Sequence, residues 1–370
     1  MDADLRQIAA YRRFWLSQTL SFMANQILMM AFGWHIYALT HSAVSLGYIG
    51  LVLFMPQLLL VLVVGQVADR YNRQRIVLIS QSMECLLCLS LAVGSATGLL
   101  TSQWIFISAF AVGTVRAFQG PAMQAMLPTL IPLSLLSKAV SLSSASRQFA
   151  TIAGPALGGI LYLGGAETVY GSGALFFLLA LMSMFGIKLP ADSRVREPVT
   201  RQSLLAGIHF IRQRRIILGA ISLDLFSVLL GGATALLPIY ADTILHTGAF
   251  GLGLLRAAPA IGALVIALYL ARRPIQQRIG KAMFAGVAGF GISTIIFAVS
   301  ESFWLSFVVL IVMGAADMVS VVIRSSLVQL ETPQAMRGRV GAVNAIFIGA
   351  SNQLGEFESG LTAAWIGVVP

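Results

Sequence analysis

The sequence predicts an all-α integral membrane protein made of two related six-helix halves. Of its 370 residues, 58% are hydrophobic and 10% are charged, with a mean hydropathy of +0.86. A soluble domain has a much smaller apolar share. Apolar runs of about twenty residues, long enough to cross a hydrocarbon core of about 30 Å as a helix, recur along the chain. The sequence also resembles itself at an offset of about 200 residues, as shown below.

Eleven apolar runs are expected to be membrane helices, separated by short loops and one long polar interval at 190–215. The runs are 14–39, 44–68, 76–98, 103–127, 139–163, 168–189, 216–240, 250–271, 282–300, 303–326 and 340–365. The first is too long for a cleaved signal peptide. It carries Asn25 and Gln26, and also His35, which we interpret as a hydrogen-bonded packing residue.

The net charge of +10 comes mainly from Lys and Arg residues in the loops, and their distribution does not indicate a nucleic-acid-binding surface. Lys and Arg occur in every second loop, whereas the loops near 40–43, 98–102, 164–168, 241–249 and 300–302 contain neither. Positive charge marks the cytoplasmic side of a membrane protein. We therefore expect a cytoplasmic N-terminus and no nucleic-acid partner.

An internal repeat relates the two halves. When the sequence is aligned with itself at an offset of 201 positions, a glycine or proline is matched with the same residue type at four places. The pairs are Gly113 with Gly314, Pro132 with Pro333, Gly154 with Gly355, and Gly159 with Gly360. We predict an N-terminal six-helix bundle at 1–189, a cytoplasmic linker with an amphipathic helix at 190–215, and a C-terminal bundle at 216–370. The sixth helix of this second bundle, expected at about 369–390, is missing from the chain.

The second and third helices are joined by "GQVADRYNRQR" (65–75), in which Gly65, Asp69, Arg70 and Arg73 form the pattern GxxxDRxxR. A carboxylate at the C-terminal end of a helix opposes the helix dipole, so Asp69 needs a partner. Arg70, Arg73 or the N-terminus of another helix can supply one.

The third and fourth helices carry unusual polar residues. Cys85 and Cys88 form a CxxC pattern, but thiolates are costly inside a membrane and the sequence has no second ligand pair, so we expect no metal site. Arg116, Gln119 and Gly120 lie in "RAFQGPA", well inside the fourth run. A buried arginine needs a charged partner or a water-filled cavity.

In the fifth run, "ATIAGPALGG" (150–159) places small residues at every fourth position, which lets another helix approach closely. A proline in the middle of this run favours a bend. The residues of this motif are Ala150, Gly154, Pro155, Gly158 and Gly159.

These three motifs, in the correct helices, resemble those of the major facilitator superfamily. "MRGRVGAVN" (336–344) and "GASNQLGEFESG" (349–360) resemble the branch that includes the enterobactin exporter and the drug:proton antiporters. The resemblance implies the major facilitator fold, with two bundles that rock around a central cavity. It also implies a cytoplasmic latch at Gly65, Asp69, Arg70 and Arg73, a cavity-facing Arg116, and an antiporter motif whose usual first glycine is Ala150 here.

A proton-driven exporter needs a carboxylate that is buried when protonated and wetted when it releases its proton. Our candidates for proton or substrate sites are Asp224 and Asp317, with Arg116 as their electrostatic partner. Glu84 either joins them or only neutralises Arg116. Arg147 and Arg256 are either cavity residues or interface anchors.

The eleventh run repeats the small-residue groove, with Glu356 in place of Pro155 and Glu358 in place of Leu157. At about 100° per residue the two acids flank the groove on opposite sides, so they are not a carboxylate pair. Glu356 is a candidate outer-gate or substrate residue, near the outer mouth.

The predicted function is secondary active export of an amphiphilic small molecule, a siderophore or drug, across the bacterial inner membrane. We expect a monomer with no enzymatic activity and no cofactor, driven by the proton gradient; the sequence has no phosphate-binding loop for ATP. The alternatives are an uptake symporter, an uncoupled lipid or solute facilitator, or a membrane sensor or assembly protein that does not transport.

Overall fold

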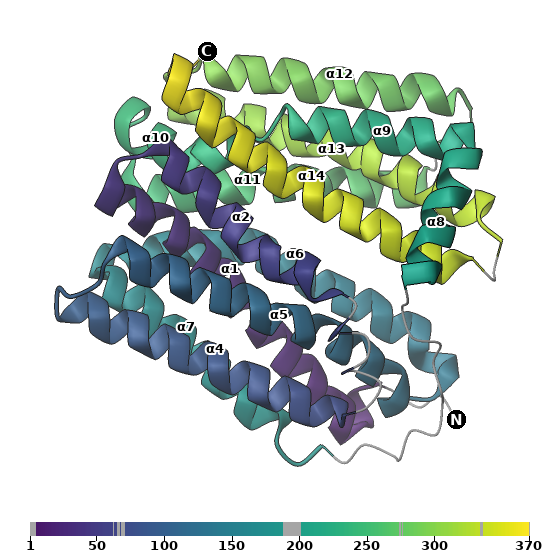
Figure 1. The fold of residues 1–370 in the computed structure, drawn as a ribbon, viewed down its shortest axis with the longest axis horizontal. Coiled ribbons are helices and arrows are strands. Elements are labelled where there is room, and N and C mark those ends of the chain that lie inside the picture. The colour runs from purple at the N-terminus through teal and green to yellow at the C-terminus, as the bar shows by residue number, and fades with distance from the viewer. Residues whose placement is uncertain are drawn as a thin grey trace. The chain divides into compact units, whose positions relative to one another are not determined.

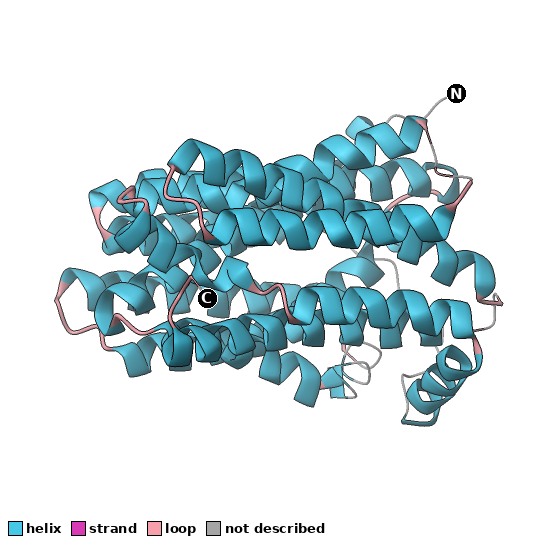
Figure 2. Ribbon diagram, turned by 90° about the horizontal axis from the view of Figure 1, so that it is seen from above, coloured by secondary structure: helices cyan, strands magenta, loops and turns pink. Residues whose placement is uncertain are grey.

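The computed structural model describes residues 5–61, 63–64, 67, 71–187, 201–273, 275, 277–333 and 336–369. These residues form helices and connecting turns, with no strand among them (Figure 2). Within these described stretches, six helical segments are apolar and long enough to cross a membrane: Arg73–Ala96, Ala166–Met184, Arg215–Ile244, Gly248–Arg272, Ile279–Ala298 and Phe303–Glu331. The predicted all-α membrane fold is confirmed.

The chain divides into two compact units. The first unit contains Met1–His35 and Met55–Pro198, and the second contains Ile36–Phe54 and Val199–Pro370. Our sequence-based division places 36–54 in the N-terminal bundle, whereas its packing belongs to the second unit. There Gly47 lies against Phe357: a Cβ added to this glycine would be 3.0 Å from the Phe357 Cα and carbonyl oxygen.

The first unit is built from the long helices α1 (Ala9–Thr40, up to His35), α4 (Arg73–Ala96), α5 (Ser102–Leu130), α6 (Leu136–Leu161) and α7 (Ala166–Met184), together with the end of α2 (Ala43–Leu59) (Figure 1). Asn72 caps α4 by accepting hydrogen bonds from the amides of Gln74 and Arg75. Thr101 caps α5 through the Trp104 amide. Side-chain acceptors satisfy amide groups that the first turn of a helix leaves open.

Two helix pairs position the first unit's polar residues. Helix α4 packs along α7, where Cys85 donates to the Ala174 carbonyl at 3.4 Å and buried Cys88 faces Gly173. Helix α1 fits the small-residue groove of α6, because a Cβ at Gly154 would clash with the Gln26 side chain. His35 is buried and hydrogen-bonded to the Tyr170 hydroxyl at 3.1 Å, as its predicted packing role requires.

The second unit contains α8 (Arg201–Gln213), α9 (Arg215–Leu229), η4 (Ala233–Leu236), α10 (Leu237–Ile239), η5 (Tyr240–Ile244), α11 (Gly248–Arg272), α12 (Ile279–Ala298), α13 (Phe303–Glu331) and α14 (Arg337–Ile366). Helix α8 is the amphipathic helix expected in the linker, and Ile211 on it is buried against α9, α13 and α14. Gly262 and Gly314 bring the backbones of α11 and α13 together, because a Cβ at either would clash with a carbonyl of the other helix.

The seventh predicted run is not one continuous α-helix. Helix α9 ends at Leu229, and after a turn the chain continues as the short segments η4, α10 and η5. Gly231 and Gly232 lie at this break, where Gly232 touches the backbone of Gly355 in α14. Two adjacent glycines weaken a helix and allow close backbone approach. The sequence pattern shows only the apolar composition, which does not reveal the interruption.

Candidate functional site

A polar cavity of about 240 Å³ lies in the first unit, between α1, α2, α5 and α6. Its lining is dominated by amide and hydroxyl side chains and includes two arginines. The lining residues are Gln18, Ser21, Phe22, Asn25, Gln26, Gln57, Arg116, Gln119, Gly120, Met123, Gln124 and Arg147. This surface is unusual for a chain that is 58% hydrophobic, because polar side chains within the membrane normally line water-filled or ligand-binding space.

Arg116 lies 14 residues, about 21 Å, from each end of α5, and therefore midway along the helix. It interacts electrostatically with Glu84 of α4, which is completely buried. Gln119, one turn after Arg116, donates a hydrogen bond of 3.1 Å to the Glu84 carboxylate. Arg116 and Gln119, the two polar residues of the fourth-helix motif, therefore both interact with Glu84. This agrees with the alternative in which Glu84 neutralises Arg116.

The network continues from α4 into α1. Gln81, one turn before Glu84, donates to the hydroxyls of Ser17 and Ser21 at 2.8 and 2.9 Å. These contacts fix α1 against α4, so that Asn25 and Gln26 of α1 reach the cavity. Arg147 enters the cavity from α6, and its guanidinium lies 5.1 Å from the centre of the Phe22 ring.

The second unit contains a separate buried charge cluster. Asp224 of α9 forms an ion pair of 3.2 Å with Arg324 of α13 and accepts a hydrogen bond of 3.0 Å from Ser320. Arg324 also donates to the Asn344 side chain of α14 at 3.3 Å. Asp317 lies on α13 two turns before Arg324 and interacts electrostatically with both Asp224 and Arg324. The structure thus brings together the two predicted acids.

Arg324 is the residue of this cluster that the sequence analysis missed. The predictions assign the acids to Arg116; within the second unit, Arg324 forms the ion pair with Asp224 and interacts electrostatically with Asp317. Arg324 is 3% exposed and lies seven residues, about 10 Å, before the end of α13. The sequence does contain a signal for Arg324, because this residue, like Arg116, is an arginine inside an apolar run.

Glu356 has a cationic partner within the second unit. It interacts electrostatically with Arg256 of α11, and its carboxylate faces Gly50 of α2. Helix α14 continues for ten residues beyond Glu356, about 15 Å, which agrees within one residue with the end of the predicted run at 365. Arg256 is thus not simply an interface anchor.

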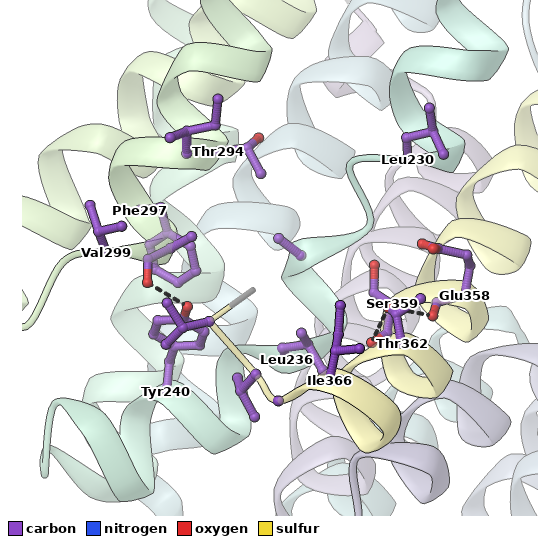
Figure 3. Close-up of a pocket in the computed structure, with 17 residues that line it drawn as sticks. Leu230, Leu236, Tyr240, Thr294, Phe297, Val299, Glu358, Ser359, Thr362 and Ile366 are labelled. Carbon is purple, nitrogen blue, oxygen red and sulfur yellow. Dashed lines mark hydrogen bonds between the residues drawn. The ribbon is translucent and has the colours of Figure 1, made fainter.

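Glu358, on another side of α14, lines a second cavity of about 440 Å³ in the second unit (Figure 3). Most of this lining is apolar, with Leu230, Leu236, Phe297 and Ile366 among its residues. Tyr240, also in the lining, donates a hydrogen bond of 2.8 Å to the Ala298 carbonyl. Glu356 and Glu358 therefore have different surroundings. The apolar cavity is lined by one charged residue, Glu358, whereas the cavity of the first unit is lined by two arginines.

Motif residues lie at helix crossings in the described part. In the antiporter motif, Ala150, Pro155 and Gly159 are buried, and Gly158 lies against Ile27 and Met30 of α1. Gly120 is exposed and lines the polar cavity. Of the latch motif, Gly65, Asp69 and Arg70 lie outside the described residues. Arg73 donates to the Ala125 carbonyl of α5 at 3.5 Å.

Comparison with known proteins places this geometry in context. The family described as "Transmembrane secretion effector" matches residues 3–369. The chain is 26% identical over 349 residues to the enterobactin exporter EntS of Citrobacter koseri, covering 92% of this chain and 82% of that protein. It is also 26% identical over 348 residues to the EntS protein of Escherichia coli O1:K1, with the same coverage.

Solved structures of similar fold are transporters. A bacterial homologue of the human lysosomal transporter Spinster, in an inward-facing, unoccupied conformation, aligns with a TM-score of 0.77 at 14% identity, over 99% of this chain and 84% of that one. An inward-facing bacterial homologue of the iron transporter ferroportin aligns with a TM-score of 0.72 at 15% identity, over 99% and 96%. The predicted superfamily and its fold are confirmed.

Proposed function

Because the chain belongs to the transmembrane secretion effector family, within the major facilitator superfamily, we propose that it exports an amphiphilic, siderophore-like molecule across the bacterial inner membrane. The similarity to enterobactin exporters along 92% of the chain is the observation that carries this proposal. In this proposal the N-terminus is cytoplasmic, the transporter acts as a monomer without a bound cofactor, and the proton gradient supplies the energy.

We assign proton coupling to Asp317. Arg324 balances the charge of one carboxylate, and Asp224 already holds it through an ion pair of 3.2 Å. Asp317 interacts with the same guanidinium, and a net charge buried in a membrane is costly. The cluster is neutral only when a proton is bound. Opening toward water on one side then releases this proton, and closure favours its uptake.

Transport into inside-out vesicles tests this function. An acid vesicle interior should drive accumulation of metal-free enterobactin, and a protonophore should abolish it. Flux that is indifferent to the protonophore and only equilibrates the two sides would support an uncoupled facilitator instead. Absence of any flux would support a protein that does not transport.

Variants of the acidic cluster test the coupling assignment. Asp317→Asn should abolish accumulation against a gradient while keeping downhill flux, because the cluster stays neutral without a proton. Asp224→Asn should also uncouple transport, since Arg324 then holds Asp317 ionised. Glu331→Gln, at the exposed end of the same helix, is the matched control and should behave like the wild type. Accumulation at the wild-type level in Asp317→Asn would refute the assignment.

A further inference from the structure

The positive charge of the first unit's cavity is not fully balanced. Arg116 interacts electrostatically with Glu84, and Gln119 donates a hydrogen bond to that carboxylate. Arg147 lines the same cavity, and its guanidinium contact within the described residues is the ring of Phe22, with no carboxylate within ion-pair distance. Among the described residues, the exposed Arg147 therefore brings to the cavity one guanidinium that no carboxylate pairs with.

The cavity also offers hydrogen-bond acceptors. Gln18 and Asn25 are 5% and 8% exposed, and the oxygen of each side-chain amide is buried without a hydrogen-bond partner in the part of the chain that the structure describes. A buried polar group without a partner is costly unless a ligand or water satisfies it. Both residues line the cavity beside Arg116 and Arg147.

The size of the cavity limits what it can hold. Sites for complete drug-sized ligands measure about 300–1,000 Å³, whereas this one has a volume of about 240 Å³. It fits one functional group or one small ring of a larger molecule. The planar guanidinium of arginine can form two parallel hydrogen bonds with a carboxylate, and the Phe22 ring lies 5.1 Å from the guanidinium carbon of Arg147.

We propose that Arg147, supported by Phe22, binds an anionic group of the transported molecule, a carboxylate or phenolate with a neighbouring hydroxyl. The guanidinium supplies the charge, and the amide oxygens of Gln18 and Asn25 accept from the hydroxyl. This inference rests on the proposed function, and it names the class of substrate as hydroxylated organic acids.

Equilibrium binding to the purified full chain tests the proposal independently of transport. The probes are radiolabelled salicylate, which carries a carboxylate beside a hydroxyl, and salicylamide, its neutral counterpart. Arg147→Gln should weaken salicylate binding about tenfold, as expected for loss of a charge-assisted hydrogen bond, and change salicylamide binding less than twofold. Arg147→Lys should keep most of the salicylate affinity, and Phe22→Leu should lower it about two- to fivefold.

Arg212→Gln is the matched control, because it removes one positive charge from an exposed position on α8. It should leave both affinities unchanged. Equal losses for salicylate and salicylamide in Arg147→Gln, or no loss for either, would overturn the anion site. Because binding is measured without a gradient, a chain that binds salicylate through Arg147 but shows no export would contradict the proposed function alone.

Discussion

At the scale of single residues, the buried charges of this protein are organised as small groups within each unit. Glu84 interacts electrostatically with Arg116 in the first unit, and Asp224 forms an ion pair with Arg324 in the second. Removing one member of a buried ion pair leaves an uncompensated charge, which costs about 3–5 kcal/mol in proteins. What a substitution does therefore depends on which charges remain.

Arg324→Gln should destabilise the protein more than Asp224→Asn. The first change leaves Asp224 and Asp317 without their shared cation, whereas the second leaves Arg324 balanced by Asp317. Thermal unfolding in detergent should show the larger loss for Arg324→Gln, of about 3–5 kcal/mol. Equal unfolding temperatures for the two variants would show that Asp317 does not share Arg324.

The sequence alone could identify most of these residues but not their partners. An acid or arginine inside an apolar run is visible in the sequence, and Glu84, Arg116, Asp224 and Asp317 were predicted on that basis. Their pairing depends on which helices pack together, for example α9 against α13, and composition does not encode it. Arg147 shows the same limit, because only the packing of α6 beside α1 brings it over Phe22.

At the scale of helices, glycines control where backbones meet. A Cβ added at Gly355 of α14 would be 2.6 Å from the Val228 carbonyl oxygen and 3.0 Å from that of Leu229. Both neighbours are backbone atoms near the break that follows α9, and they cannot move aside as a flexible side chain can. The repeat aligns Gly355 with Gly154, which meets α1 in the first unit.

Gly355→Ala should therefore destabilise the second unit by about 1–3 kcal/mol or more, the usual cost of overpacking. Gly219→Ala, on the neighbouring α9, is the matched control: a Cβ there has nothing within 4 Å, and alanine favours a helix by about 1 kcal/mol over glycine. Thermal unfolding and the monodispersity of the purified variants measure both effects. A Gly355→Ala protein as stable as Gly219→Ala would contradict this close approach.

At the scale of the whole molecule, the distribution of positive charge gives a testable orientation. Loops predicted to lie outside contain no Lys or Arg, and those predicted inside contain many. Both natural cysteines are buried, so alanine can replace them at modest cost and leave a chain suited to single-cysteine labelling.

In that background, Ser42→Cys and Glu301→Cys should react in intact cells with a maleimide that does not cross the inner membrane. Arg212→Cys and Arg278→Cys should react only after the membrane is permeabilised. The opposite pattern would reverse the proposed orientation, and labelling of all four positions in intact cells would invalidate the predicted topology. The extent of labelling, read on a gel, decides between these outcomes.

The sequence by itself determined the membrane-spanning character, the helical runs, the repeat and the superfamily. These features follow from composition and residue spacing. A segment that spans the membrane must be apolar and helical, because lipid offers its backbone groups no hydrogen-bonding partners. Only the tertiary structure decided the break after α9, the pairing of Arg324 with Asp224, and the cavity that Arg147 enters. Each of these depends on contacts between residues far apart in the chain, where packing determines the neighbours of a buried charge.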